Sequence, residues 1–296
     1  MPSIDKNKSI LFKFLSIFSV VRIHNILIIV LAQYLTSIFI LSEKEFFEVV
    51  LDYSLFLLII CSSISIASGY IINNFYDDEK DLINRPIRYK IDKVVKKSTK
   101  LNLYFFLYFC CVFFAYLISW RAVLFFSVYI FFLWLYSHKL KKILFVGNFI
   151  SSLLTITPFF AILLYYKNID MIIFVYSLFL FFIILTKDIT KDLENIKGDF
   201  TLNYKTLPVI FGERFTKLIV GLMIIINIFL IINLILNFNQ GLMYYYYYFS
   251  LLALLVFLIK LTRSSNKNDY LFLHNILRLI IVVGVFCIVL IKPSIL

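Results

Sequence analysis

The chain has 296 residues, of which 62% are hydrophobic, 19% are aromatic and only 16% are charged, and its formal net charge is +12. This composition, with a mean hydropathy of +0.95, excludes a soluble enzyme or a soluble binding module. Because charges do not interrupt the apolar runs, the sequence predicts an all-α, polytopic membrane protein.

A membrane-spanning helix needs about 20 mostly apolar residues. Lys6, Lys8 and Lys13 precede the first such run, as basic residues do in a signal peptide, but the run is too long and no small-residue cleavage site follows. We therefore expect it to remain as a helix. About nine spans are predicted, with the least distinct boundary at "LISWRAV": 17–40, 51–72, 101–119, 121–138, 148–166, 170–186, 216–237, 243–261 and 275–293.

The connections between these runs alternate in charge. Lys and Arg concentrate in the N-terminal segment, in the 73–100 and 187–217 connections, and in "SHKLKK" and "KLTRSSNKND", whereas the intervening connections are short or acidic. Cytoplasmic loops carry the excess of Lys and Arg, so we expect a cytoplasmic N-terminus and an outer C-terminus in a cell membrane. Topology and anionic membrane lipid then explain the net charge, and neither a nucleic-acid partner nor an obligate protein partner is expected.

Acidic residues follow the second run directly. Asn73, Asp77 and Asp81 recur every four residues, so on a helix they share one face. Carboxylates this close to hydrocarbon usually mark an ion or substrate path. Three oxygen ligands on one face suit Mg²⁺, with waters and substrate phosphate oxygens completing its coordination. A solvated acidic helix end is the alternative interpretation.

A second acidic stretch follows the sixth run, on the same predicted side of the membrane. Asp188, Asp192, Asn195 and Asp199 are spaced four, three and four residues apart, again along one helical face. Two such stripes with bound metal ions would hold a diphosphate between them and make it a leaving group. Cationic side chains suited to phosphate oxygens are interspersed: Arg85, Arg88, Lys90, Lys187 and Lys191.

The two stretches resemble the signatures of the UbiA-type intramembrane prenyltransferases. The first signature, roughly N-D-x-x-D-x-x-x-D-x-x-N-R-P, is similar to this chain at Asn73, Asp77, Asp81, Asn84, Arg85 and Pro86. The second, K-D-I-E-D-x-x-G-D followed by T-L-P, is similar at Lys191, Asp192, Glu194, Gly198, Asp199 and Thr206 to Pro208. Two further segments, "VRIHNILI" and "LYSHKLKKILFVGN", also resemble the family and supply Arg22, Asn25, Tyr136, Ser137, Lys139, Lys142 and Asn148.

The resemblance implies a UbiA-type bundle of nine helices in a single domain, 1–296, with pseudo-repeated halves near 17–138 and 148–293. It also implies Mg²⁺-dependent transfer of a prenyl group from an isoprenoid diphosphate, geranylgeranyl diphosphate in the most similar branch, to a lipophilic acceptor. That branch uses a glycerol-phosphate ether lipid. A quinone precursor or another aromatic acceptor is the alternative. A small-molecule transporter is the alternative outside enzymes, although its coupling acids would usually lie near the middle of a span.

The resemblance also assigns roles to residues. The implied catalytic set is Asp77, Asp81, Asp192 and Asp199. The implied metal ligands are Asn73, Asp77, Asp81, Asp188, Asp192, Asn195 and Asp199. The implied substrate-binding residues are Arg22, Asn25, Arg85, Lys139, Lys142, Lys191 and Tyr136, although Tyr136 is equally consistent with an ordinary interfacial tyrosine. Three features depart from the family pattern: Asn74 and Asn195 stand where Asp is usual, and "IRYKIDKV" follows the N-R-P motif.

Overall fold

The computed structural model describes residues 15–292, so Lys6, Lys8 and Lys13 lie outside the described residues. Within this range the secondary structure is helical, without strands, and nine helices are long and apolar enough to cross a membrane. The predicted all-α, polytopic architecture is therefore confirmed. The nine candidate spans are Ile23–Leu41, Tyr53–Tyr76, Lys97–Ile118, Trp120–His138, Val146–Tyr166, Met171–Glu194, Leu207–Asn237, Gly241–Arg263 and Lys267–Ile291.

The ends of several helices differ from the predicted spans. Helix α10, Met171–Glu194, continues eight residues past the predicted end at 186, because helical hydrogen bonding does not stop where the apolar run stops. The boundary between the third and fourth spans, in "LISWRAV", is a true break. Ser119 is fully extended there (φ −174°), and its hydroxyl accepts a hydrogen bond from the Ala122 N–H. The predicted first span, 17–40, is interrupted at Arg22, whose φ of 55° lies in the left-handed region, and the candidate membrane helix begins at Ile23.

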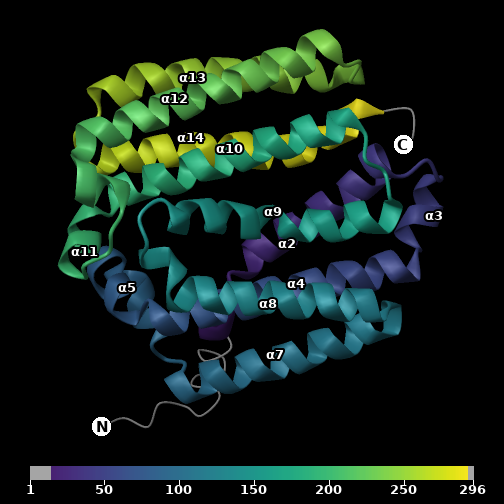
Figure 1. The fold of residues 1–296 in the computed structure, drawn as a ribbon, viewed down its shortest axis with the longest axis horizontal. Helices are drawn as coiled ribbons and strands as arrows, with labels where there is room; N and C mark the ends of the chain where they lie inside the picture. Colours follow the sequence, from purple (N-terminus) through teal and green to yellow (C-terminus); the bar gives the residue numbers. More distant parts are fainter. Residues whose placement is uncertain (1–14, 293–296) are drawn as a thin grey trace. The chain divides into compact units, whose positions relative to one another are not determined.

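The chain divides into two compact units. Unit 1 comprises the described part of 1–30 together with Leu57–Lys139, and unit 2 comprises Leu31–Phe56 and the described part of 140–296. Unit 1 contains most of α4 (Tyr53–Tyr76), the short helices α5 (Asp78–Asn84) and α6 (Pro86–Asp92), and the antiparallel neighbours α7 (Lys97–Ile118) and α8 (Trp120–His138) (Figure 1). Its α4 packs against α8, where Gly69 lies beneath the Leu133 side chain.

In unit 2, α10 is the central helix. It packs against α9 (Val146–Tyr166), α12 (Leu207–Asn237) and α14 (Lys267–Cys287), and α13 (Tyr244–Arg263) packs against α12 and α14 (Figure 1). The shorter elements of this unit are η1 (Ser37–Leu41), α3 (Phe46–Val50), η2 (Leu140–Lys142), α11 (Ile196–Thr201), η3 (Gly241–Met243) and η4 (Ile288–Ile291), and helix α2 (Ile23–Thr36) leads into η1.

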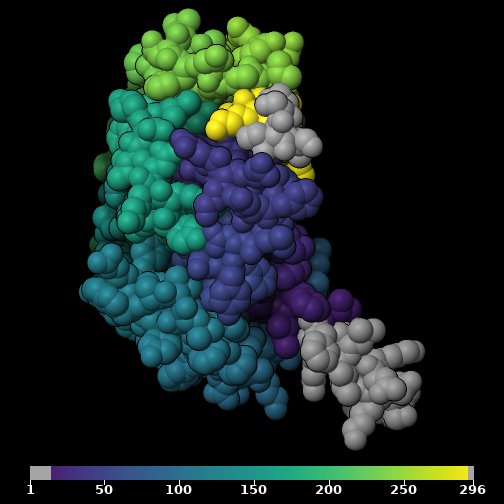
Figure 2. Space-filling model, turned by 90° about the vertical axis from the view of Figure 1, so that its right-hand side faces the viewer, coloured from purple at the N-terminus to yellow at the C-terminus, as the bar shows by residue number. Residues whose placement is uncertain are grey.

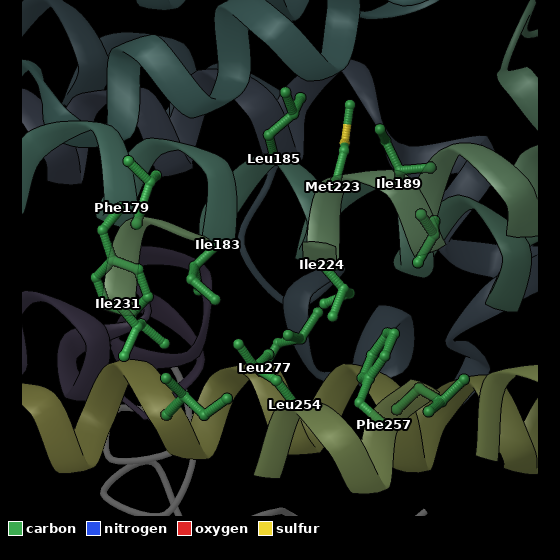
Figure 3. Close-up of a cluster of buried hydrophobic side chains, with 14 of the residues drawn as sticks. Phe179, Ile183, Leu185, Ile189, Met223, Ile224, Ile231, Leu254, Phe257 and Leu277 are labelled. Carbon is green, nitrogen blue, oxygen red and sulfur yellow. The ribbon is translucent and has the colours of Figure 1, made fainter. Parts of the chain in front are cut away.

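The core of unit 2 is a layer of aliphatic and aromatic side chains between α10, α12, α13 and α14. Ile183 and Ile189 on α10 meet Ile224 on α12, and Leu254 and Leu277 close the layer from α13 and α14 (Figure 3). All five are at most 1% exposed. This packing fixes the direction of α10 and therefore the position of the acidic residues on its last two turns.

Several connecting segments of unit 2 lie together at one end of the unit. The turn after η1 and the turn after α9 meet there, since Asn168 Nδ2 lies 3.4 Å from the Leu41 carbonyl oxygen. The segment η4 contacts both η1 and η3 at the same end (Figure 2). Helix α10 begins here at Met171, so its acidic C-terminal turns lie at the opposite end of the unit.

The exposed face of α7 shows where part of the chain's high aromatic content lies. Phe105, Phe109, Phe113 and Tyr116 follow one another at helical spacing and are between 50% and 74% exposed. Contiguous exposed aromatic side chains are rare on soluble proteins and are expected where a helix faces lipid. The protein is therefore a multi-pass membrane protein.

Candidate active site

The first acidic segment lies at the junction between α4 and α5. Helix α4 ends at Tyr76 and Asp77 precedes α5 with a non-helical backbone (φ −94°, ψ 7°). Hydrogen bonds nevertheless continue in the helical pattern, from the Asp77 N–H to the Asn73 carbonyl (3.0 Å) and from the Asp81 N–H to the Asp77 carbonyl (2.8 Å). The predicted four-residue repeat is thus maintained across the break, and the Asn73 amide also donates to the Asp77 carboxylate over 2.8 Å.

Three arginines of unit 1 affect the pKa of Asp81 in this segment. Burial and the nearby Asp77 carboxylate raise the pKa of Asp81, whereas Arg85, Arg22 and Arg88 act in the opposite direction. Burial and the neighbouring Arg88 lower the pKa of the Arg22 guanidinium. Like charges brought together and partly desolvated destabilise one another, so this cluster favours the binding of an anion.

The candidates Arg22 and Asn25 converge on one aromatic residue. The Arg22 guanidinium carbon lies 5.0 Å from the centroid of the Tyr70 ring, and Asn25 Nδ2 lies 3.3 Å from the Tyr70 hydroxyl. A guanidinium over an aromatic face is stabilised by the ring quadrupole. Tyr70 was not predicted from the sequence, although its position three residues before Asn73 on α4 places it near the same helical face.

Two other acidic residues of unit 1 have cationic partners. Asp78 pairs with Lys97 (3.2 Å) and Lys100 (3.4 Å) at the start of α7. Asp92, at the end of α6, is 3% exposed and pairs with Arg88. Sequence reasoning missed Asp92, because a single acid in the basic stretch "YKIDKVVKK" is typical of a solvated loop.

The second acidic segment has the same local construction as the first. Asp188 and Asp192 lie on the last turns of α10, Asn195 ends that helix with a non-helical backbone (φ −108°, ψ 15°), and Asp199 lies on the short helix α11. The Asn195 N–H bonds to the Lys191 carbonyl (3.2 Å) and the Asp199 N–H to the Asn195 carbonyl (3.1 Å), so the helical spacing again survives the break.

Helix α9 positions the two carboxylates of α10. Asn148 Nδ2 donates to Asp192 Oδ2 over 2.7 Å, and the Ser151 hydroxyl donates to Asp188 Oδ2 over the same distance. Asp188 also lies 3.4 Å from the Lys187 ammonium group. Sequence reasoning missed Ser151, although its three-residue spacing from Asn148 in an apolar helix matches the four-residue spacing of the two acids.

Burial is greatest at Asn195 and Asp199. Asp199 is fully buried and Asn195 is 4% exposed. The Asn195 amide nitrogen donates to the Lys191 carbonyl over 2.8 Å, which leaves its Oδ1 atom buried without a hydrogen bond to the described residues. Glu194 on the same segment contacts His274 of α14, with 3.3 Å between the carboxylate Oε2 and the ring Nδ1.

The remaining substrate-binding candidates lie near the ends of helices. Lys139 is the exposed residue that ends α8, and Tyr136 is half-buried one turn earlier. Lys142 is exposed, with its ammonium group 5.4 Å from the centroid of the Tyr204 ring, and Lys191 is half-buried between Asp188 and Asp192. Arg85 ends α5, where its N–H bonds to the Asp81 carbonyl over 2.9 Å.

The donor set fits a magnesium ion. Among residues 15–292, no group of three or more His, Cys, Asp or Glu side chains is arranged to hold a metal by itself. Mg²⁺ is usually held by one or two carboxylates together with waters and substrate phosphates, so it needs no such group. Each acidic segment offers two or more carboxylates and an amide oxygen. The buried Asn195 Oδ1 is a possible metal ligand that accepts no hydrogen bond from residues 15–292.

Known proteins share both the sequence and the fold. A model of the UbiA prenyltransferase family matches residues 30–282. The digeranylgeranylglyceryl phosphate synthase of Methanosphaera stadtmanae is 31% identical over 208 residues, which cover 70% of this chain and 73% of that protein. The synthase of the same name from Sulfurisphaera tokodaii is 30% identical over 213 residues, covering 71% and 75%.

Two solved structures have the same fold. One, from work on digeranylgeranylglyceryl phosphate synthase in membranes, superposes with a TM-score of 0.71 at 20% identity and covers 95% of this chain and 99% of its own. A UbiA homologue from Archaeoglobus fulgidus, bound to GPP and Mg²⁺, superposes with a TM-score of 0.68 at 14% identity and covers 93% and 99%.

The apolar spans and the acidic helix ends define an integral-membrane protein with polar chemistry at the ends of its helices. The family match extends over most of these spans. The chain belongs to the UbiA prenyltransferase family. It is a prenyltransferase. The family match therefore excludes the small-molecule transporter that the sequence alone left as an alternative.

Proposed function

We propose that this prenyltransferase transfers a geranylgeranyl group from geranylgeranyl diphosphate to a glycerol-phosphate ether lipid, with Mg²⁺ as its cofactor. The proposal is supported by the two synthases that share about 30% of its residues over more than two thirds of both chains. The GPP and Mg²⁺ bound to the Archaeoglobus fulgidus homologue support an isoprenoid diphosphate as donor and magnesium as metal.

The observation that carries the proposal is the arrangement of charge in unit 1. Asp77 and Asp81 occupy one face of their segment. The positive charges of Arg22, Arg85 and Arg88 are near enough to lower the pKa of Asp81, against the raising effect of burial and Asp77. Carboxylates alone would suit a metal and arginines alone would suit a phosphate, whereas their combination suits a metal-bound diphosphate.

In this proposal the acidic segments supply the metal ligands. Asp77, Asp81, Asp192 and Asp199 are the principal ones, with Asn73, Asp188 and Asn195 assisting. Bound Mg²⁺ would neutralise the diphosphate and make it a better leaving group. Arg22 and Arg85 would pair with the diphosphate oxygens and hold the donor in place, as would Lys139, Lys142 and Lys191.

The two acidic segments have a repeated construction. Each follows a long apolar helix, each is interrupted at one residue, Asp77 or Asn195, and each ends in a short helix. This similarity supports a single prenyltransferase domain with two pseudo-repeated halves. The Lys and Arg distribution supports a cytoplasmic location for both segments and for the N-terminus, with the C-terminus outside.

The acceptor is tested with membranes that contain the full chain. Radiolabelled geranylgeranyl diphosphate is supplied with either a glycerol-phosphate ether lipid or an aromatic quinone precursor, in Mg²⁺ or in EDTA, and the lipids are extracted and separated. We expect Mg²⁺-dependent label in the ether lipid. Label in the aromatic acceptor alone would assign the alternative function, and the absence of transfer to either would contradict the proposal.

A further inference from the structure

Asp92 in unit 1 is a buried carboxylate with three hydrogen-bond donors around it. Its Oδ1 accepts from the Ser19 hydroxyl over 2.8 Å, and its Oδ2 accepts from Asn74 Nδ2 over 2.9 Å and from Arg88 Nε over 3.3 Å. Only 3% of Asp92 is exposed. A buried carboxylate is tolerated when it is paired and hydrogen-bonded in this way, so these contacts form one compensated network.

The network depends on an amide at position 74. An ionised carboxylate only accepts hydrogen bonds, so the Asn74 Nδ2 must face Asp92 and the Oδ1 must face away. That Oδ1 is buried without a hydrogen bond to the described residues, and Asn74 is 7% exposed. A second carboxylate at position 74 would place two like charges in close contact in a poorly solvated site.

The same network holds the Arg88 side chain and contacts the backbone of Arg22. Arg88 is held at two points, by its Nε on Asp92 and by its Nη2 on the Ser19 carbonyl oxygen (2.9 Å). The Ser19 carbonyl also accepts the backbone N–H of Arg22 over 3.2 Å, at the residue whose backbone is left-handed. Ser19 and Asp92 therefore set the position of the Arg88 guanidinium, which acts electrostatically on Asp81.

We propose that Asn74 and Asp92 are a charge-matched pair of positioning residues that holds the Arg88 guanidinium for binding of the donor's diphosphate near Asp81. The inference rests on the proposed function for the identity of the donor. Neither residue touches the diphosphate. They act through the Arg88 guanidinium, because a guanidinium held by two hydrogen bonds loses less conformational freedom when it binds a phosphate.

The test exchanges the two side chains. In the full-length protein, Asn74→Asp, Asp92→Asn and the double variant N74D/D92N are compared with wild type for KM and kcat with geranylgeranyl diphosphate, and for thermal unfolding. We expect each single substitution to raise KM about ten-fold, as is typical when a supporting residue is lost. The double variant restores one carboxylate facing one amide, so we expect it to recover most of that loss.

A matched control separates positioning from stability. Asn227 on α12 in unit 2 is fully buried, and its Nδ2 donates to the Met223 carbonyl over 2.9 Å, so Asn227→Asp also introduces a buried carboxylate. We expect it to lower thermal stability without raising KM. If Asn74→Asp does not fold, Ser19→Ala removes one donor to Asp92 and is expected to raise KM about three-fold, a smaller effect because the Arg88–Asp92 pair remains.

Binding of inorganic pyrophosphate in Mg²⁺, measured by calorimetry on the same variants, distinguishes the failure of this inference from the failure of the proposed function. Weaker binding by the single variants with recovery in N74D/D92N would support the pair even if no acceptor is found. Unchanged KM and pyrophosphate affinity in folded single variants would overturn it. Additive losses in a folded double variant would overturn it as well, because they would show that the two side chains act independently.

Discussion

Asn148 on α9 donates a hydrogen bond to Asp192 on α10, with 2.7 Å between its Nδ2 and the carboxylate Oδ2. The contact joins residues 44 positions apart in the sequence. It orients a carboxylate that we propose as a metal ligand and leaves the other oxygen, Oδ1, outside this contact. Such supporting hydrogen bonds are usually important for metal affinity.

The first prediction concerns this contact. Asn148→Ala removes the donor and lets the Asp192 carboxylate rotate, so the Mg²⁺ concentration for half-maximal transfer should rise about ten-fold. The measurement is activity against Mg²⁺ concentration in purified protein. Thr155→Ala, which removes an exposed hydroxyl bonded to the Ser151 carbonyl on the same helix, is the control and should leave the requirement unchanged. Equal curves for Asn148→Ala and wild type would show that this contact does not support a metal ligand.

The second prediction concerns the amide at the break between α10 and α11. Asn195→Asp replaces a neutral oxygen by a charged one at a buried position whose Oδ1 makes no hydrogen bond to the described residues. Hard cations prefer the charged oxygen, so the Mg²⁺ requirement should fall, while the maximal rate stays similar or decreases if diphosphate release becomes slower. Mg²⁺ titrations provide the measurement. A requirement that does not move would separate Asn195 from the metal.

Much of the fold was predictable because the membrane imposes it. Apolar runs of the required length identify all nine candidate spans, and the four-residue spacing of Asn73, Asp77 and Asp81 survives in the structure because helical hydrogen bonds continue across the break at Asp77. The extension of α10 to Glu194 was not predicted, because hydropathy detects the apolar run and not the helix that continues beyond it.

The supporting contacts were beyond prediction for a different reason. Ser19 and Asp92 are 73 residues apart, and Ser151 and Asp188 are 37 apart, so no local spacing connects either pair. Local periodicity predicts which residues share a face of one helix, whereas tertiary packing decides which face of another helix they meet. The sequence therefore indicated the acidic residues and Asn148, but not the contacts that Ser19 and Ser151 make.

The third prediction concerns the sidedness of the acidic segments. In a variant without the four native cysteines, single cysteines replace Glu79, Lys197 or Ile169, all of which are exposed. Positive-inside topology predicts that an impermeant thiol reagent added to intact cells labels Ile169→Cys but not the other two, which react only after the membrane is opened. Labelling of Glu79→Cys and Lys197→Cys from different sides would exclude a shared cytoplasmic location.

The fourth prediction concerns a tight approach in unit 2. Gly241 has a φ of 54°, and a Cβ there would overlap the Ile291 carbonyl oxygen of η4. Gly241→Ala should therefore lower the free energy of unfolding by about 1–3 kcal/mol, since both the backbone conformation and the space favour glycine. Gly221→Ala within α12, where nothing lies within 4 Å of the added Cβ, is the control and should not destabilise the protein. Equal thermal midpoints for the two variants would contradict the prediction.

The central claim is that carboxylates of each acidic segment are metal ligands that prenyl transfer requires. It is tested most directly by measuring Mg²⁺-dependent transfer from radiolabelled geranylgeranyl diphosphate in folded Asp77→Ala and Asp192→Ala. Asp170→Ala is the matched control, because Asp170 is an exposed acid at the other end of α10 whose side chain makes no capping hydrogen bond. A metal ligand contributes several kcal/mol, so we predict that each of the first two variants loses roughly 100-fold or more in rate and that the control keeps wild-type activity. Full activity in Asp77→Ala or Asp192→Ala, or in wild type with EDTA, would contradict the account.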